Sequence, residues 1–319
     1  MRFDFLNPQV KDNPVSSLSM LVLGEIILSL QDSLIKFMSS ETSFWQLQFI
    51  RSIGNIVLLI LIAKFTKGIH LLIPVNWKPV YFRALTMTTC MFCFFAASPK
   101  LSFAQMAAGL YTFPIFVSLL AIIFLNERIG IWRIFALILG SSGALLILEP
   151  WSENFSLLQI LPIMAGFFFA CNIILIRKYC REESVMSLTL AVGIMFFASA
   201  SLGILFFEFI YKDSIYRDAS PFVFIGWPLL SFIVFLFCLS CSILNITGNM
   251  LLAKAYQTAE SSWLAPMDYS YLVFATIWGK VFFGVWPSYL NAFGMFLIAS
   301  SGILIAFREQ IKTKNQQRK

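Results

Sequence analysis

Ionisable side chains recur inside a stretch of the chain that is otherwise apolar. Glu25, Asp32 and Lys36 follow one another at intervals of seven and four residues, which places them on one stripe of a helix. A charge near the centre of a bilayer is costly, so such residues usually face a cavity or a partner. The stripe therefore favours ion pairing or the binding of a charged solute, and its acidic members also permit proton coupling.

A second polar stripe follows in the next apolar stretch. Gln48, Arg51 and Asn55 are spaced as i, i+3 and i+7, which again is one helix face. Asp32 and Arg51 lie in consecutive helices of opposite direction at similar distances from the helix centres, so we expect them at one depth. A buried pair of these two residues is one interpretation, and direct contact with a solute is the other. We assign Glu25 and Arg51 structural or gating roles.

Two prolines interrupt apolar stretches in corresponding positions of the two halves of the chain. Pro114 frees the backbone carbonyl of Leu110, and Pro266 frees that of Ser262. Broken helices in this arrangement point to the binding site of a transporter. A packing kink is the alternative, because proline is common in membrane helices. The sequence thus predicts a structural or gating role for both prolines.

Asp268 follows Pro266 by two residues and lies in the inner half of its predicted span. A carboxylate there must be protonated, paired with a protein cation, or left to pair with a solute. Asn172 and Asn245 are expected at a similar depth, where they would bind neutral parts of the solute. This layer predicts an aminated, zwitterionic or sulfonium-type substrate, whereas a hydrogen bond from Asp268 to a neighbouring helix is the alternative.

Aromatic side chains near these polar groups complete the predicted binding site. Ligand sites combine apolar or aromatic walls with a few placed polar groups, although many aromatic side chains in such a chain simply pack between helices. The predicted substrate contacts are Asp32, Phe95, Tyr111, Asn172, Asn245, Trp263, Asp268 and Tyr269.

Two CxxC patterns, Cys90 to Cys93 and Cys238 to Cys241, lie within apolar stretches. Structural zinc sites usually fold a loop around the metal, and the single histidine, His70, lies in a predicted loop. We therefore expect no metal and no cofactor, and interpret these small residues as sites of close helix approach. Without a cluster of nucleophiles, bases or metal ligands near an aqueous face, a membrane enzyme is a remote alternative.

Composition defines the elements that must hold these residues. The chain of 319 residues is 59% hydrophobic and only 12% charged, with a mean hydropathy of +0.82, which indicates an all-α integral membrane protein. Each span needs roughly 20 mostly apolar residues. Ten such spans are predicted, at about 18–38, 45–64, 79–98, 102–125, 131–148, 157–176, 185–208, 226–252, 262–284 and 288–307.

Lysine and arginine gather in the connections on one side of these spans, which predicts that both termini are cytoplasmic. The net charge of +7 is then a topology signal and requires no nucleic acid partner. The first residues lack the features of a cleaved signal peptide, so the first span should be retained. The expected partners are the lipid bilayer and a small-molecule substrate, with a homodimer as a candidate assembly, and the family resemblance described below implies the inner membrane of a bacterium as the location.

The chain is expected to consist of two repeats, at residues 1–150 and 151–319. Five spans per repeat is an odd number, so the second copy must be inverted in the membrane, which is a recurring architecture of alternating-access transporters. The sequence Glu41-Thr42-Ser43 is echoed weakly by Glu182-Glu183-Ser184. In each half, glycines of the last span, Gly140 with Gly143 and Gly294 with Gly302, predict close helix contact.

The sequence also resembles the ten-helix EamA-type drug/metabolite transporters of bacteria over nearly its whole length. In the first half, the resemblance is carried by Asp32, Lys36, Arg51, Arg83, Phe94-Phe95-Ala96, Thr112-Phe113-Pro114-Ile115-Phe116, Glu127-Arg128-Ile129-Gly130 and Gly140-Ser141-Ser142-Gly143. In the second half, it is carried by Ala265-Pro266, Asp268-Tyr269, Phe283-Gly284, Trp286-Pro287-Ser288, Gly294, Ser301-Gly302 and Arg308-Glu309.

The second-half motifs look like the subgroup that contains S-adenosylmethionine and riboflavin uptake carriers. Val285 departs from that pattern, because members of the subgroup commonly carry a glutamate there. The resemblance implies a cavity lined mainly by helices 1, 3, 4, 6, 8 and 9 that opens to each side in turn. It leaves open whether the substrate is an amino acid, a nucleoside-like cofactor, a vitamin or an amine.

A transporter of a small polar metabolite, secondary-active or facilitative, is therefore the favoured function. The substrate predicted from Asp268 is an aminated, zwitterionic or sulfonium-type metabolite, such as an amino acid or an S-adenosylmethionine-like compound. A riboflavin-type vitamin carrier and a metabolite exporter are the alternatives. A non-transporting scaffold has no need for Glu25, Asp32 and Asp268 inside the membrane.

Overall fold

The computed structural model describes residues 14–66, 68–125, 131–148, 157–180, 183–211, 220–258 and 270–317. Within these ranges the chain is helical and contains no strand, which confirms the predicted all-α class. The main helices are α1 (Pro14–Phe37), α2 (Phe44–Phe65), α3 (Trp77–Ala96), α4 (Phe103–Leu110), α5 (Phe113–Leu125), α6 (Ile131–Leu148), α7 (Ile160–Tyr179), α8 (Val185–Leu205), α11 (Phe232–Thr258), α13 (Ser270–Phe283) and α14 (Tyr289–Gln317).

Short helical turns connect these long helices. They are η2 (Met38–Ser40), η3 (Ile69–Leu72), η4 (Leu157–Gln159), the π-helical η5 (Phe206–Ile210) and α10 (Pro221–Phe224). In the described part of the chain, seven helices are long and apolar enough to cross a membrane. Three further apolar helices are shorter, at Ile134–Ile147, Ser270–Phe283 and Tyr289–Ser301. With α4 and α5 as two parts of one span, these helices correspond to the ten predicted spans.

Serine residues fix the starts of three helices. The Ser43 hydroxyl accepts from the amide of Gln46 at the start of α2, and Ser184 accepts from Ser187 at the start of α8. Ser102 forms a full capping box with Gln105 at the start of α4. These bonds satisfy amide groups that would otherwise lack a partner at the first turn of each helix.

The fourth span is interrupted between α4 and α5, at Tyr111 and Thr112, directly before Pro114. The Thr112 hydroxyl donates to the carbonyl of Gly109 across the break, at 2.7 Å. Helix α7 lies very close to this point, because a side chain added at Gly166 would approach the carbonyl oxygen of Leu110 to 2.8 Å. Backbone groups freed by a break are tolerated inside a membrane where protein surrounds them or a cavity adjoins them.

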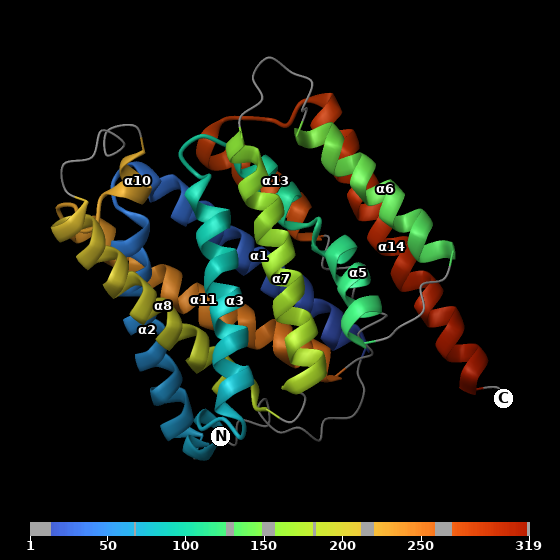
Figure 1. The fold of residues 1–319 in the computed structure, drawn as a ribbon, viewed down its shortest axis with the longest axis horizontal. Coiled ribbons are helices and arrows are strands. Elements are labelled where there is room, and N and C mark those ends of the chain that lie inside the picture. Colours follow the sequence, from blue (N-terminus) through green and yellow to red (C-terminus); the bar gives the residue numbers. More distant parts are fainter. Residues whose placement is uncertain are drawn as a thin grey trace.

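Glycines bring the last spans of the two halves together; close helix contact at glycines of each span was predicted, whereas the contact of these two spans with each other was not. A Cβ atom added at Gly143 of α6 would lie 2.6 Å from the carbonyl oxygen of Gly294 in α14, which leaves no room for a side chain. Figure 1 shows α6 and α14 side by side along one edge of the bundle. Close approach of this kind increases van der Waals contact between helices in lipid.

The helix contacts of one half of the chain recur in the other half. Each span of the first half corresponds to the span that comes five spans later. Helix α1 packs on α11 as α7 packs on α3, and α1 packs on α13 as α7 packs on α4 and α5. The pairs α2 with α8 and α6 with α14 map onto themselves. This pairing is consistent with two inverted repeats.

The helix caps follow the same exchange. Ser43, at the start of α2, donates to the carbonyl of Gly226 in the connection that precedes α11, at 2.8 Å. Ser184, at the start of α8, donates to the carbonyl of Leu71 in the connection that precedes α3. The weak echo around Ser43 and Ser184 in the sequence therefore corresponds to matched contacts in the fold.

Candidate functional site

A cavity of about 210 Å³ lies at the centre of the bundle. Its described walls come from α1, α2, α3, α4, α7, α8, α11 and α13, and it reaches Tyr111 at the break of the fourth span. Four charged residues line it, namely Glu25 and Asp32 from α1, Arg51 from α2 and Arg83 from α3. We call this space the central cavity. It combines both signs of charge with apolar walls, as polar-ligand sites do.

A chain of hydrogen bonds crosses one side of the central cavity. Asn55 donates to the side-chain oxygen of Asn245 at 3.3 Å, and Asn245 donates to Gln31 at 2.8 Å. Gln31 in turn donates to Asp32 at 2.6 Å, and the Tyr271 hydroxyl donates to the other Asp32 oxygen at 2.7 Å. The chain joins α2, α11, α1 and α13, so it holds the polar walls of the cavity in one arrangement.

Asp32 and Arg51 both line the central cavity, but the carboxylate is held by Gln31 and Tyr271 instead of by the guanidinium. No direct hydrogen bond or ion pair joins Asp32 and Arg51 among the described side chains. The guanidinium lies over the ring of Phe196, 5.5 Å from its centre, and its Nε atom is buried without a hydrogen-bond partner. The expectation of a direct pair is therefore corrected. The reason is that Gln31 on α1 and Tyr271 on α13 donate to the two oxygen atoms of the Asp32 carboxylate.

The remaining predicted residues line the central cavity, lie elsewhere in the described part of the chain, or fall outside the described residues. Tyr111, Asn245 and Glu25 line the central cavity together with Asp32 and Arg51. Phe95 packs in the core against Phe94, with ring centres 4.9 Å apart, and is not among the residues that line this cavity.

Asn172 is buried in α7, and its side-chain oxygen has no hydrogen-bond partner. It too is absent from the lining of the central cavity in this conformation. Pro114 is placed by its backbone at the start of α5. Trp263, Pro266, Asp268 and Tyr269 lie outside the described residues.

Four residues of the site were not among the predicted substrate contacts. Gln31 and Tyr271 hold Asp32, Asn55 extends the same chain, and Arg83 lines the cavity while donating to the carbonyl of Leu188 at 3.0 Å. Gln31 and Arg83 carried a signal, because each is a polar residue inside a predicted apolar span. Arg83 lies near the start of its span, where a positive charge is also expected as a topology signal. The position of Tyr271 depends on helix packing, and one more tyrosine in an aromatic-rich chain gives no sign of it.

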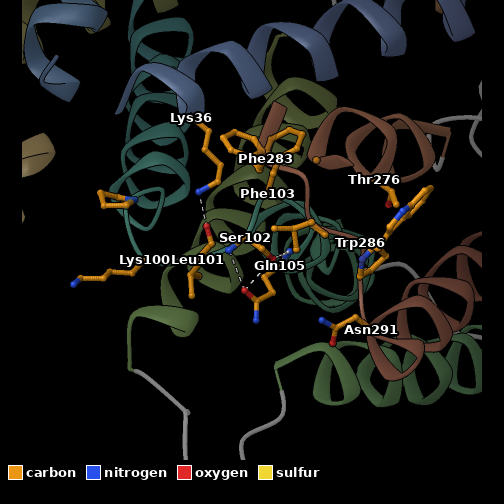
Figure 2. A pocket seen from close by; sticks show the side chains of 15 residues that line it. Lys36, Lys100, Leu101, Ser102, Phe103, Gln105, Thr276, Phe283, Trp286 and Asn291 are labelled. Atoms are coloured by element: carbon orange, nitrogen blue, oxygen red, sulfur yellow. Dashed lines mark hydrogen bonds between the residues drawn. The ribbon is translucent and has the colours of Figure 1, made fainter. Parts of the chain in front are cut away.

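A second cavity, of about 310 Å³, lies at the end of the bundle where α1 ends and α4 begins. Figure 2 shows Lys36 directed toward the connection between α3 and α4. Its ammonium group donates to the carbonyls of Ser98, at 2.5 Å, and Leu101, at 2.6 Å, and lies 5.3 Å from the ring centre of Phe283. We call this space the Lys36 cavity. Lys36 therefore joins three helices at this end of the bundle.

The fold and the central cavity define a multi-pass membrane protein with a polar site lined by its spans. Residues 15–149 match the EamA-like transporter family, so the first half of the chain carries an EamA-like transporter domain. This finding confirms the resemblance predicted from the motifs. The matched family is one of transporters, and the relatives described below are named transporters, which favours a transporter over an enzyme.

Three relatives illustrate the range of this similarity. A riboflavin transporter of Vibrio cholerae is 27% identical over 67% of this chain and 65% of its own length. An uncharacterized transporter of Helicobacter pylori is 26% identical over 92% of this chain and 95% of its own length. An S-adenosylmethionine uptake transporter of Rickettsia bellii is 26% identical over 63% of this chain and 62% of its own length.

A solved crystal structure of a protein shares the fold. It aligns with a TM-score of 0.59 over 92% of this chain and 96% of the other chain, at 16% sequence identity. At that identity the likeness concerns the arrangement of helices and leaves the substrate open.

Proposed function

We propose that the protein is an alternating-access transporter, secondary-active or facilitative, of a small aminated, zwitterionic or sulfonium metabolite. The observation that supports this proposal is the central cavity, in which two carboxylates, Glu25 and Asp32, and two guanidinium groups, Arg51 and Arg83, surround about 210 Å³. Charges at membrane depth are expensive and are usually retained for function. A zwitterion offers a partner to each sign of charge.

The bonding of the individual groups favours such a solute. Asp32 is held by two neutral donors, Gln31 and Tyr271, so its negative charge has no direct cationic partner among the described side chains. The buried Nε atom of Arg51 lacks an acceptor. An amino or sulfonium group beside Asp32 and a carboxylate beside Arg51 would supply both missing interactions. Charged groups removed from water gain most from partners of this kind.

The size of the central cavity restricts the solute in this conformation. Pockets for drug-sized ligands typically measure about 300–1,000 Å³, whereas this cavity measures about 210 Å³. An amino-acid-sized metabolite is therefore favoured over an S-adenosylmethionine-like compound, which would need the helices to move apart.

A riboflavin-type vitamin carrier is the alternative that a specific observation supports. Tyr111 and Tyr271 stack with ring centres 5.1 Å apart, and Phe169 and Phe196 also line the cavity. Aromatic rings of this kind would bind a flat heterocycle by stacking. The cavity would have to widen for such a solute. The direction of transport is a separate question, and export is the alternative to uptake.

We further propose that residues 1–150 and 151–319 form two inverted five-helix repeats with the central cavity between them. The mirrored helix pairing and the matched contacts of Ser43 and Ser184 support this division. The excess of lysine and arginine in the connections supports cytoplasmic termini, and the bacterial origin of the relatives supports a location in a bacterial inner membrane. A homodimer stays a candidate assembly.

A binding experiment on the purified protein tests the proposed substrate class. Thermal unfolding is measured with a panel of amino acids, amines, S-adenosylmethionine, riboflavin and dicarboxylates. A ligand present at 100 times its Kd should stabilise the folded protein by about 2.7 kcal/mol. We expect stabilisation by zwitterionic or cationic members of the panel.

Matched variants make the experiment specific to the cavity. Asp32→Asn should abolish the stabilisation, whereas Glu41→Gln, an equivalent change at an exposed position between α1 and α2, should preserve it. The proposal fails if only neutral or anionic compounds stabilise the protein. Unchanged stabilisation of the Asp32→Asn variant by a cationic or zwitterionic ligand would also contradict it.

A further inference from the structure

The central cavity and the Lys36 cavity follow one another along the same three helices. Helix α1 contributes Asp32 to the central cavity and Lys36, one turn later, to the Lys36 cavity. Helix α4 contributes Leu110 and, at its other end, Phe103, while α13 contributes Tyr271 and then Thr276. Two cavities that share three walls in this order lie along one line through the bundle.

Two aromatic rings separate the cavities at the point where α4 meets α13. Phe103 lines the Lys36 cavity, Tyr271 lines the central cavity, and their ring centres are 6.4 Å apart. Both side chains are almost completely buried, at 1% and 4% exposure. At this point the barrier is therefore the thickness of two rings.

Tyr271 connects this barrier to the polar network. Its hydroxyl donates to Asp32 at 2.7 Å, and its ring stacks on Tyr111 beside the break between α4 and α5. Tyr271 is therefore part of both the barrier and the group of side chains that holds Asp32.

The charge of the Lys36 cavity differs from that of the central cavity. Its charged lining residues are Lys36 and Lys100, and no acidic side chain is among the residues described around it. Figure 2 shows the amide side chains of Gln105 and Asn291 beside the space and the Lys36 ammonium group directed at the Leu101 carbonyl, whereas the exposed side chain of Lys100 extends away from it. Two carbonyl bonds leave Lys36 one further N–H donor. A cleft with charge of one sign concentrates ions of the opposite sign.

We propose that the Lys36 cavity is a second chamber on the solute path, which receives the carboxylate end of an anionic or zwitterionic solute, and that Phe103 and Tyr271 form the gate between it and the central cavity. This inference rests on the proposed transport function. The gate predicts that water-soluble reagents reach the central cavity from the Lys36 side only when one of the two rings is moved or removed.

Cysteine labelling tests the gate without reference to transport. The six native cysteines are replaced, and one reporter, Met87→Cys, is placed in the lining of the central cavity. A membrane-impermeant methanethiosulfonate reagent is applied to the face from which Lys100→Cys is labelled. Truncation in Phe103→Ala leaves a cavity in place of one ring and should raise the labelling rate of the reporter from that face by about tenfold.

The matched control is Phe94→Ala, which removes a fully buried ring of the core that lines neither cavity. It should leave the labelling rate unchanged. Phe103→Leu provides a milder change if the alanine variant does not fold, and it should raise the rate in the same direction. Equal rates for the Phe103 and Phe94 variants would overturn the gate. Because labelling measures access alone, this failure is distinct from failure of the transport function.

A second reporter tests the charge of the chamber. Ala104→Cys lines the Lys36 cavity, and its labelling rates with an anionic sulfonate reagent and a cationic trimethylammonium reagent are compared. The anionic-to-cationic ratio should exceed that of Glu41→Cys, an exposed position in the connection between α1 and α2, by about threefold, and Lys100→Gln should lower it. A ratio equal to that of the exposed position would overturn the assignment of a carboxylate-binding chamber.

Discussion

Replacing Gln48 by leucine should stabilise the protein, although it removes a polar residue from the stripe that faces the central cavity. Gln48 is fully buried in α2, and both its side-chain nitrogen and its side-chain oxygen lack hydrogen-bond partners. Each buried group left unsatisfied costs about 1–3 kcal/mol. Leucine has a similar volume and no polar atoms, so Gln48→Leu should raise the free energy of unfolding by about 1–3 kcal/mol.

Gln46 provides a matched control two positions earlier in the same helix. It is also fully buried, but its amide donates to the carbonyl of Pro228 at 2.8 Å, and its oxygen accepts from Thr42 at 2.7 Å. Gln46→Leu should therefore destabilise the protein by about 1–3 kcal/mol, because it leaves those partners unpaired. Thermal unfolding in one detergent compares the two variants. Destabilisation of Gln48→Leu to the same extent as Gln46→Leu would refute the reasoning.

Three further predictions concern the network, the helix packing and the substrate. Tyr271→Phe removes one hydrogen bond to Asp32 and should lower the free energy of unfolding by about 0.5–1.5 kcal/mol, measured by denaturation; an unchanged value would remove this bond from the network. Gly143→Ala should cost about 1–3 kcal/mol because of its contact with the α14 backbone, whereas at Gly279 the nearest atom lies 4.0 Å away and Gly279→Ala should be tolerated; equal losses would contradict this packing. Asp268→Asn should weaken transport of cationic and zwitterionic solutes more than that of anionic ones, and retained affinity for its cationic or zwitterionic substrate would reject this role.

The sequence predicted the elements well, because membrane spans have a strong local signal. Apolar runs and the break before Pro114 correspond directly to helices and their interruption. Close helix contact at Gly143 and at Gly294 was also predictable, since small residues in membrane helices mark close approach, although the sequence did not show that these two glycines face each other. The prediction of inverted repeats follows from the odd number of spans expected in each half. Each of these inferences depends on residues that are near in sequence.

The contacts of the site were less predictable, because they depend on which helices meet. Asp32 and Arg51 share a depth, but depth alone does not determine the partner of a side chain. Tyr271 reaches Asp32 only because α13 packs on α1, a contact between residues 239 positions apart. Phe95 was predicted as a substrate contact because it is an aromatic residue near polar ones. In the structure it is fully buried in the core and does not line the central cavity. Helix packing thus determines which side chains meet in the site, whereas composition determines where the membrane spans lie.

Solute flux in reconstituted vesicles tests the central claim most directly. Purified protein in proteoliposomes should exchange a radiolabelled amino acid or another aminated metabolite that stabilises it, with a rate that saturates at high concentration. Asp32→Asn should reduce this flux, while Glu41→Gln should retain it. Chemical conversion of the solute without flux, or flux that is unaffected by Asp32→Asn, would contradict the account of a polar solute carried through the central cavity.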